Sequence, residues 1–296
     1  MESVLPEWTC GALGQHSLPN KPFKTCSNRF LTMKKNFVRS KLKLGQPSIG
    51  SWLTLPDPTA ARLMGRIGFD WLTVEMEHTP TTLETAVNSF MAISSGGTVP
   101  LVRVPWNNGE NIKRVLDIGA WGIIVPMVNS REEAEAAVAA ARYRKPGRRS
   151  VGGQLHAVSF DTDAATYYAK ADEEILVVVM AEHVEAIDNA ESILSVPGID
   201  AVFIGPNDLL NSMGYEPAFD SDKKEFIDAV GHIKDTAKRN GVAPGIHVAN
   251  SAAAQHRIQE GFQMIAIASE VGMMLAKAKE IAAELDLKSR GEVAKY

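Results

Sequence analysis

Short apolar segments alternate with longer helical patterns from residue 47 almost to the end of the chain, and this alternation limits the possible folds more than any other feature. We predict eight strands, which span residues 48–55, 69–74, 99–104, 122–125, 175–181, 201–204, 243–248 and 264–267. The eight predicted helices span residues 58–67, 81–93, 108–118, 131–142, 184–195, 222–240, 251–260 and 271–285. Eight strand–helix pairs in about 240 residues are the number and size expected of a (β/α)8 barrel, the TIM barrel.

An open, doubly wound sheet is the alternative fold, because it also alternates strands with helices. A dinucleotide-binding sheet of this kind carries a G-x-G-x-x-G sequence after its first strand, and this chain has none there. The sequence therefore favours an α/β barrel, with residues 46–296 as one catalytic domain.

The composition indicates a globular protein and excludes two classes of partner. Of the 296 residues, 45% are hydrophobic and 22% are charged, and the formal net charge is −4. A nucleic-acid-binding domain would show a strongly basic face, and a membrane helix would need about 20 consecutive apolar residues. The sequence shows neither feature, so we expect no nucleic-acid partner and no membrane.

Residues 1–45 differ from the rest of the chain. They include eight lysines or arginines within residues 21–43, and no acidic residue occurs within residues 8–56. We predict an irregular, basic N-terminal extension outside the barrel. Both cysteines, Cys10 and Cys26, lie in it, which fits a reducing compartment. We expect a cytoplasmic location, with organelle targeting by the basic segment as the alternative.

Polar side chains follow most of the predicted strands at their carboxyl ends, which is the rim where barrel enzymes place their active sites. In the segment FDWLTVEMEHTP, residues 69–80, an apolar strand leads directly into two carboxylates and a histidine. Together the strand ends predict a polar site above an apolar core. The residues concerned are Trp52, Thr54, Glu75, Glu77, His78, Arg103, Glu182, Asp208, His247 and Asn250.

Glu182 and Asp208 form the most specific pair, because they follow neighbouring strands that would share one barrel mouth. Two carboxylates without a cysteine suit a hard cation such as Mg²⁺ or Mn²⁺, with positions left for water and substrate oxygens. Co²⁺ is a further candidate. Alternatively, each carboxylate caps the helical turn that follows it. Taken jointly, the pair favours a divalent-metal site.

Arg103 and His78 are candidates for substrate binding and proton transfer. Arg103 follows an apolar strand, where it either pairs with a carboxylate or faces an anionic substrate. His78 is either a surface histidine or a base that works near neutral pH, and Asp117 could orient it. No lysine ends a predicted strand, so a Schiff-base nucleophile is missing. A metal, an arginine and a histidine suit a 2-oxo acid and the enolate formed from it.

The order and spacing of several segments resemble the HpcH/HpaI aldolase family, the 4-hydroxy-2-oxoheptanedioate aldolase-like enzymes with phosphoenolpyruvate-type barrels. The resemblance covers about residues 45 to 285 and rests on FDWLTVEMEHTP, LVRVPWNN, IIVPMV, RKPGRRSVGG, the Glu182 region and GIDAVFIGPNDLLNSMGY. It implies a metal-dependent carbon–carbon lyase that cleaves or forms 4-hydroxy-2-oxo acids through a metal-stabilised pyruvate enolate. The implied partners are a 2-oxo acid of the pyruvate or oxaloacetate type and an aldehyde or another electrophile.

The resemblance also implies roles for individual residues. Glu182 and Asp208 match the metal ligands of the family. His78 matches the histidine that deprotonates the substrate, directly or through a bound water, and Asp117 matches the acid that raises the basicity of that histidine. Arg103 matches the arginine that steadies the oxo-acid oxygens.

The substrate pocket matches the family in part. Trp52 matches a tryptophan of the pocket wall, and the backbone amides of Ala181 and Asn207 fall where the family binds the substrate carboxylate. Glu75 stands where the family usually has Asp, and Met180 where it usually has Gln. Because productive geometry is held within roughly 0.5 Å, we expect these two candidate site residues to alter the acceptor half of the reaction.

Two alternatives to the aldolase function stay open, and the resemblance also predicts an assembly of several subunits. One function is that of an enzyme similar to macrophomate synthase, a relative that decarboxylates oxaloacetate and adds the enolate to an unusual electrophile. The other is a barrel without catalysis that acts as a binding protein, which loss of a metal ligand would indicate. The last predicted helix carries a broad apolar stripe, and terminal helices of the family exchange between subunits. The resemblance therefore implies a homo-oligomer, a hexamer built from dimers.

Overall fold

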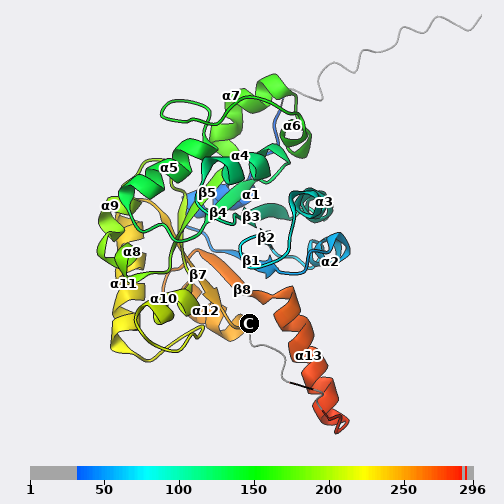
Figure 1. Ribbon diagram of the computed structural model, residues 1–296, viewed down its shortest axis with the longest axis vertical. Helices are drawn as coiled ribbons and strands as arrows, with labels where there is room; N and C mark the ends of the chain where they lie inside the picture. Colours follow the sequence, from blue (N-terminus) through cyan, green and yellow to red (C-terminus); the bar gives the residue numbers. More distant parts are fainter. Residues whose placement is uncertain (1–31, 289–290, 292–296) are drawn as a thin grey trace, which may run out of the picture.

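The computed structural model describes residues 32–288 and 291, which form a closed barrel of eight parallel strands surrounded by helices (Figure 1). The predicted (β/α)8 fold is confirmed. Each strand pairs with its neighbours in chain order, and β8 closes the barrel on β1. The strands are β1 Ser48–Leu53, β2 Trp71–Glu75, β3 Val99–Arg103, β4 Gly122–Val125, β5 Leu176–Ala181, β6 Ala201–Ile204, β7 Ala243–Val248 and β8 Met264–Ser269.

Most of the outer helices lie where the sequence predicts them. They are α2 Pro58–Met64, α3 Leu83–Ser94, α4 Gly109–Asp117, α5 Arg131–Ala141, α11 Lys224–Arg239, α12 Ser251–Gln259 and α13 Glu270–Glu284. The helix predicted over residues 184–195 is instead two short helices, α8 Val184–Asp188 and α9 Ala190–Leu194. Three helices were not predicted, namely α6 Leu155–Ser159, α7 Ala164–Glu174 and α10 Pro206–Ser212.

A further helix, α1 Phe37–Lys43, lies at the amino end of the barrel, where its N-cap Asn36 donates a hydrogen bond of 3.2 Å to the carbonyl oxygen of Trp121, directly before β4. It lies within the predicted extension of residues 1–45, so the part of that segment next to the barrel is ordered. Arg39 Nε lies 2.7 Å from the Oδ1 atom of Asp200, which directly precedes β6, and this ion pair is almost fully buried. Residues 1–31, with both cysteines, lie outside the described residues, and the domain boundary at residue 45 stays a prediction.

Aromatic side chains fill the barrel interior beneath the carboxyl rim. The ring centroid of Phe203 lies 6.4 Å from that of Trp71 and 5.8 Å from that of Trp52, both edge-to-face. Gly50 makes room for Trp71, because a Cβ atom at this position would lie 2.1 Å from the indole ring. The interior is therefore a packed core, and it supports a site at one end of the barrel.

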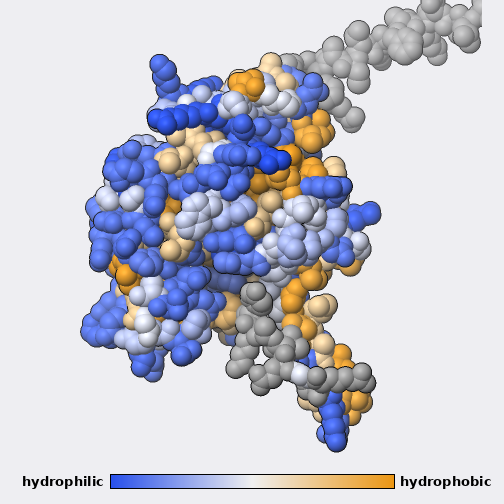
Figure 2. All heavy atoms as spheres, viewed as in Figure 1, coloured by the Kyte–Doolittle hydropathy of each residue, from blue (hydrophilic) through white to orange (hydrophobic). Residues whose placement is uncertain are grey.

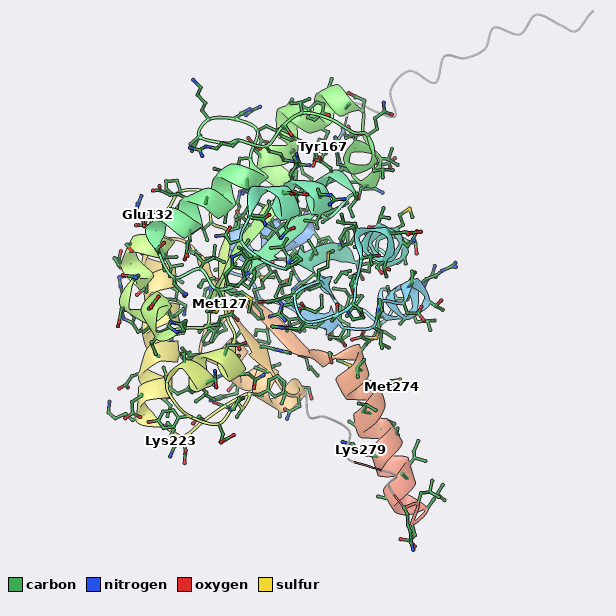
Figure 3. All side chains as sticks on the ribbon, viewed as in Figure 1. Met127, Glu132, Tyr167, Lys223, Met274 and Lys279 are labelled. Carbon is green, nitrogen blue, oxygen red and sulfur yellow. The ribbon has the colours of Figure 1, made fainter. Side chains whose placement is uncertain are left out.

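Helix α13 projects from the barrel as an arm (Figure 1). Among the side chains of α13, only Glu270 at its start is buried, whereas Met274 and Ile281 are 55% and 46% exposed. Figure 2 shows the hydrophobic surface along this arm, and Figure 3 labels Met274 and Lys279 on it, away from the barrel. No helix in the described part of the chain has the length and apolar content needed to cross a membrane.

Candidate active site

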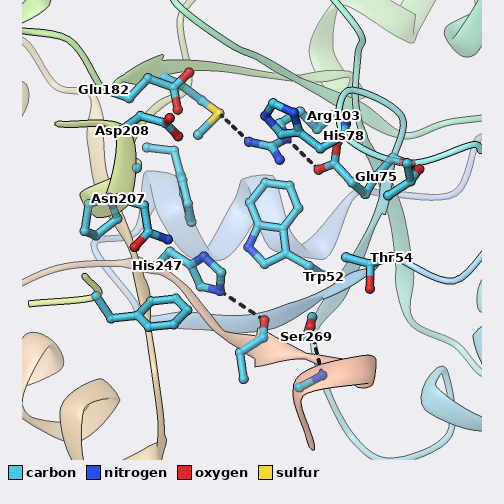
Figure 4. Close-up of a pocket in the computed structure, with 18 of the residues that line it drawn as sticks. Trp52, Thr54, Glu75, His78, Arg103, Glu182, Asn207, Asp208, His247 and Ser269 are labelled. Carbon is cyan, nitrogen blue, oxygen red and sulfur yellow. Dashed lines mark hydrogen bonds and ion pairs between the residues drawn. The ribbon is translucent and has the colours of Figure 1, made fainter. Parts of the chain in front are cut away.

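A cavity of about 840 Å³ opens at the carboxyl ends of the strands (Figure 4). Its lining residues come from all the strands except β4 and from the segments that follow β1, β2, β5, β6, β7 and β8. The barrel thus brings together predicted site residues that are far apart in the sequence. Those that line the cavity are Trp52, Glu75, His78, Arg103, Met180, Glu182, Asn207 and Asp208.

Glu182 directly follows β5 and is 2% exposed. Its Oε1 atom accepts a hydrogen bond of 2.8 Å from the backbone N–H of Met127, whereas its buried Oε2 atom has no hydrogen-bond partner among the described residues. Burial raises the pKa of Glu182 to about 7, although the Met127 N–H and the charge of Arg103 oppose the shift. A buried carboxylate oxygen without a partner calls for a cation or a proton.

The backbone around Glu182 is shaped to hold this carboxylate. Met127, which donates to it, has a φ of 51°, a left-handed conformation that costs energy in a residue with a side chain. Gly205 leaves the space that the carboxylate fills. Asp208, in the first turn of α10, is exposed at the same side of the cavity (Figure 4). Glu182 and Asp208 therefore face one region of the cavity, and their role as metal ligands stays a prediction.

Arg103 is held by ion pairs at the end of β3. Its Nε atom lies 2.5 Å from Glu75 Oε2 and 3.3 Å from Glu77 Oε2, and the guanidinium lies over the ring of Trp52 at 4.8 Å. Burial opposes the charge of Arg103, but Glu75 and Glu77 outweigh it, so its pKa is raised above the ordinary value. Arg103 Nη1 also contacts Met180 Sδ at 3.9 Å. The arginine is therefore charged and fixed in place.

Glu75 holds the turn that carries His78. Its Oε1 atom accepts hydrogen bonds from the backbone N–H groups of Glu77 at 2.6 Å and of His78 at 3.1 Å. The His78 side chain is 55% exposed, and its Nε2 atom lies 3.6 Å from Glu77 Oε2. Burial raises the pKa of Glu77. Both oxygens of Glu75 are thus engaged, which suits a positioning role, while His78 is free to reach a ligand.

Two residues predicted for the site do not line the cavity. Ala181 lies within β5, buried in the barrel wall. Asp117 ends α4, and because this helix runs back toward the start of β4, it lies at the amino end of the barrel. There its Oδ1 atom accepts a hydrogen bond of 2.7 Å from Arg149 Nη2. A single chain therefore does not bring Asp117 to His78.

The structure adds His247, which the sequence identified as a strand end but not as a site residue. His247 ends β7 and lines the cavity, as do Phe219 and Ser269. Its Nε2 atom lies 3.0 Å from the carbonyl oxygen of Ala268. Burial lowers the pKa of His247 to about 4, so the ring is neutral at pH 7. The polar residue at the end of an apolar strand was the available signal in the sequence.

The donor set at Glu182 and Asp208 fits a hard cation. Within the described residues, no group of three or more His, Cys, Asp or Glu side chains is arranged to hold a metal ion. A pair of carboxylates is smaller than such a group, but Mg²⁺ and Mn²⁺ sites in enzymes commonly use few carboxylates and leave positions for substrate oxygens and water. The unpartnered Glu182 Oε2 atom is a ligand atom of the required kind.

A TIM barrel with buried charged groups around a cavity at its carboxyl rim defines a barrel enzyme. More specifically, the chain belongs to the HpcH/HpaI aldolase/citrate lyase family, whose model matches residues 48–277, and it is accordingly a lyase. The predictions of the family and of an enzyme are confirmed.

Individual relatives agree with this assignment. The chain is 34% identical over 249 residues to the hydroxypyruvate/pyruvate aldolase of Rhizorhabdus wittichii, covering 84% of this chain and 98% of that protein. It is 38% identical over 249 residues to the 4-hydroxy-2-oxo-heptane-1,7-dioate aldolase of Salmonella dublin. This match covers 84% of this chain and 94% of that protein.

Solved structures share the barrel. A family protein from Burkholderia cenocepacia J2315 has a TM-score of 0.79 and 29% identity, covering 85% of this chain and all of that one. Macrophomate synthase shares the fold, with a TM-score of 0.73 and 20% identity. The match covers 87% of this chain and 94% of that chain.

Proposed function

We propose that this protein is a metal-dependent pyruvate aldolase that cleaves or forms 4-hydroxy-2-oxo acids. The observation that carries the proposal is the buried Glu182 Oε2 atom, which has no partner and lies in a cavity that Asp208 and Arg103 also line. The names of the relatives, aldolases of pyruvate and of a 4-hydroxy-2-oxo acid, support the same substrate class.

Glu182 and Asp208 would hold the divalent cation, with Mg²⁺ and Mn²⁺ as the first candidates. Bound there, such an ion would attract the carboxylate and keto oxygens of a 2-oxo acid and stabilise negative charge on the keto oxygen. Arg103 adds a fixed positive charge at the same cavity, and Glu75 and Trp52 keep its guanidinium in position. The site would therefore favour the enolate over the keto form of the 2-oxo acid.

His78 supplies the base. It removes a proton from C3 of pyruvate, and the electron pair of that C–H bond moves to form the enolate. The enolate carbon then forms a bond to the aldehyde carbon, the keto C=O bond re-forms, and the aldehyde oxygen takes up the proton that His78 had removed. Cleavage of the 4-hydroxy-2-oxo acid reverses these steps. Glu77, 3.6 Å from His78 Nε2, is the carboxylate that would stabilise the protonated imidazole.

Proton exchange of pyruvate in heavy water tests this proposal, because it reports enolate formation without an acceptor. We expect the methyl signal of pyruvate in the NMR spectrum to disappear with Mg²⁺ or Mn²⁺ and to persist after chelation. Glu182→Gln should abolish the exchange while the fold survives, and Glu185→Gln, at an exposed position of α8, should not. Exchange that is retained by Glu182→Gln would contradict the proposed site.

Decarboxylation of oxaloacetate would be a second activity of the same site, because loss of CO₂ from oxaloacetate leaves the pyruvate enolate. Metal-dependent decarboxylation of oxaloacetate should therefore accompany pyruvate exchange. An enzyme similar to macrophomate synthase would decarboxylate oxaloacetate and fail to add pyruvate to simple aldehydes. Comparison of the two rates distinguishes the aldolase from this alternative.

Assembly into a homo-oligomer built from dimers is also part of the proposal. Helix α13 exposes Met274 and Ile281, and its C-cap Leu285 is exposed as well, along an arm whose only buried side chain is Glu270 at its start. Exposed apolar side chains on one helix are stabilised when a second copy covers them.

A further inference from the structure

The part of the cavity around His247 is aromatic and neutral, in contrast to the charged region around Arg103. The ring of His247 contacts Phe219 edge-to-face, with a centroid distance of 4.9 Å, and contacts Trp52 at 5.7 Å. In Figure 4, Trp52 lies between Arg103 and His247. The cavity therefore has two regions, and the enolate chemistry proposed above occupies only the charged one.

The hydrogen bond of His247 fixes which ring nitrogen faces a ligand. A carbonyl oxygen only accepts hydrogen bonds, so the contact with Ala268 places the proton of the neutral ring on Nε2. Nδ1 is then an acceptor, and no described residue donates a hydrogen bond to it. Ala268 has a φ of 47°, a left-handed conformation in a residue that is not glycine. Such backbone strain is typical of positions at binding sites.

Ser269 places a hydrogen-bond donor in the same region. Its Oγ atom accepts a hydrogen bond of 3.1 Å from the backbone N–H of Gly272 as the N-cap of α13. The hydroxyl hydrogen has no acceptor among the described residues, and Ser269 lines the cavity. An acceptor on His247 and a donor on the residue after Ala268 suit a ligand hydroxyl group, which donates one hydrogen bond and accepts another.

The charges of the lining residues exclude a second anionic group near His247. Among the described residues that line the cavity, Arg103 is the only arginine or lysine, and Glu75 already pairs with it. A carboxylate placed against Phe219 and Trp52 would lose its hydration without a compensating charge. The acceptor molecule that fits here is therefore uncharged.

We propose that His247 and Ser269 form the acceptor subsite and select an uncharged aldehyde that carries a hydroxyl group. The hydroxyl donates to His247 Nδ1 and accepts from Ser269 Oγ–H, while the aldehyde carbon faces the enolate. The preferred substrate for cleavage is thus a 4-hydroxy-2-oxo acid with a further hydroxyl on the part that leaves as the aldehyde. This inference rests on the proposed aldolase function, whose reaction it leaves unchanged.

Aldol addition of pyruvate to three aldehydes tests the inference. Glycolaldehyde carries the hydroxyl, acetaldehyde lacks it, and succinic semialdehyde carries a carboxylate instead. We expect kcat/KM for glycolaldehyde to exceed that for acetaldehyde by roughly tenfold, the effect of one or two hydrogen bonds between neutral groups. Succinic semialdehyde should be the poorest acceptor of the three.

Two variants of His247 assign the preference to this residue. His247→Phe keeps an aromatic ring against Trp52 and Phe219 but removes Nδ1, and His247→Leu removes the ring. Both should lower the glycolaldehyde-to-acetaldehyde ratio from about tenfold toward one, in keeping with the loss of the hydrogen bond to Nδ1. His256→Leu, on the exposed face of α12, is the matched control and should keep the ratio of the parent protein.

Pyruvate exchange in heavy water, measured on the same samples, distinguishes failure of the acceptor inference from failure of the proposed function. If the parent protein exchanges pyruvate protons but prefers acetaldehyde or succinic semialdehyde, the acceptor inference is overturned and the proposed function stands. A ratio that His247→Phe leaves unchanged overturns the role of His247 in the same way. If the parent protein exchanges no protons, the proposed function fails, and the acceptor inference fails with it.

Discussion

Gly205 lies against the carboxylate of Glu182, so closely that a Cβ atom at position 205 would lie 2.6 Å from Glu182 Oε2. The backbone φ of −95° at Gly205 is accessible to any residue. Glycine is therefore needed here because a side chain would collide with Glu182, and not because of an unusual backbone conformation. We therefore predict that Gly205→Ala displaces the Glu182 carboxylate and lowers metal-dependent pyruvate exchange about 100-fold, as for a misplaced catalytic group.

Gly231→Ala is the matched control for this substitution. Gly231 lies in α11, and apart from the backbone of its own helix no atom lies within 4 Å of the added Cβ. Alanine should therefore leave exchange unchanged and stabilise the helix by up to about 1 kcal/mol. Calorimetric titration with Mn²⁺ and oxalate, an enolate mimic, should show weaker binding in Gly205→Ala alone. Equal metal affinity in the two variants would show that the packing of Gly205 against Glu182 has no part in the site.

Glu75 is expected to contribute to stability as well as to activity, because it neutralises a buried arginine. Glu75→Gln keeps the size of the side chain but leaves Arg103 with a single carboxylate, Glu77, at the longer distance of 3.3 Å. Removing one partner of a buried ion pair costs about 3–5 kcal/mol, and urea unfolding measures this loss. Glu110→Gln breaks an exposed pair with Arg114 and should cost less than about 1 kcal/mol. Similar losses in both variants would argue against a buried, charged Arg103.

The fold and most of the cavity could be predicted from the sequence, because both depend on periodicity and order along the chain. Once the strands are placed, parallel topology carries Glu182 and Asp208 to one rim, and no detail of packing is needed. Local conformation was harder to predict. Asn189, with φ −96° and ψ 8°, divides one expected helix in two, and the short helix α10 lacks the length that gives a helical period.

Asp117 and His247 are two residues whose place in the site the sequence did not predict correctly. Asp117 lies late in its helix, and helices of a barrel run opposite to the strands, so its position already indicated the amino end rather than the site. The family resemblance gave it a role that the geometry of one chain does not support. His247 lies at a strand end, but the orientation of its ring in the cavity depends on a hydrogen bond to the carbonyl oxygen of Ala268, a residue with a left-handed backbone. No sequence pattern specifies either feature.

The exposed face of α13 predicts that the oligomeric state depends on this helix. Met274→Glu combined with Ile281→Glu places two charges where a second copy would bury apolar surface, so the assembly should dissociate. Analytical ultracentrifugation measures the mass of each species. Lys279→Glu, a charge reversal on the same helix, serves as the control and should leave the parent assembly intact. A parent protein that sediments as a monomer would refute the proposed assembly.

The neutral state of His247 makes the stability of the protein depend on pH in a defined window. The pKa of this ring falls from 6.5, its ordinary value, to about 4 in the folded protein, chiefly because burial opposes its charge. Between these two values the unfolded chain binds the proton and the folded protein does not. The free energy of unfolding therefore has its full value, as far as His247 is concerned, above pH 6.5, and it decreases as the pH falls toward 4. At pH 5 the loss is on the order of 2 kcal/mol, from about 1.4 kcal/mol per pH unit.

His247→Phe removes this proton-linked effect but leaves every other titrating group. The difference in free energy of unfolding between the parent protein and His247→Phe should therefore shift by about 2 kcal/mol in favour of the variant from pH 7 to pH 5. Urea unfolding at the two pH values measures it, and His256→Leu, which removes an exposed histidine, should show no comparable shift. Parallel pH profiles for the parent and His247→Phe would mean that the ring keeps its ordinary pKa of 6.5 in the folded protein and is therefore hydrated rather than buried. In that case water would compete for Nδ1, which would then not be the buried acceptor that selection of a hydroxylated aldehyde requires.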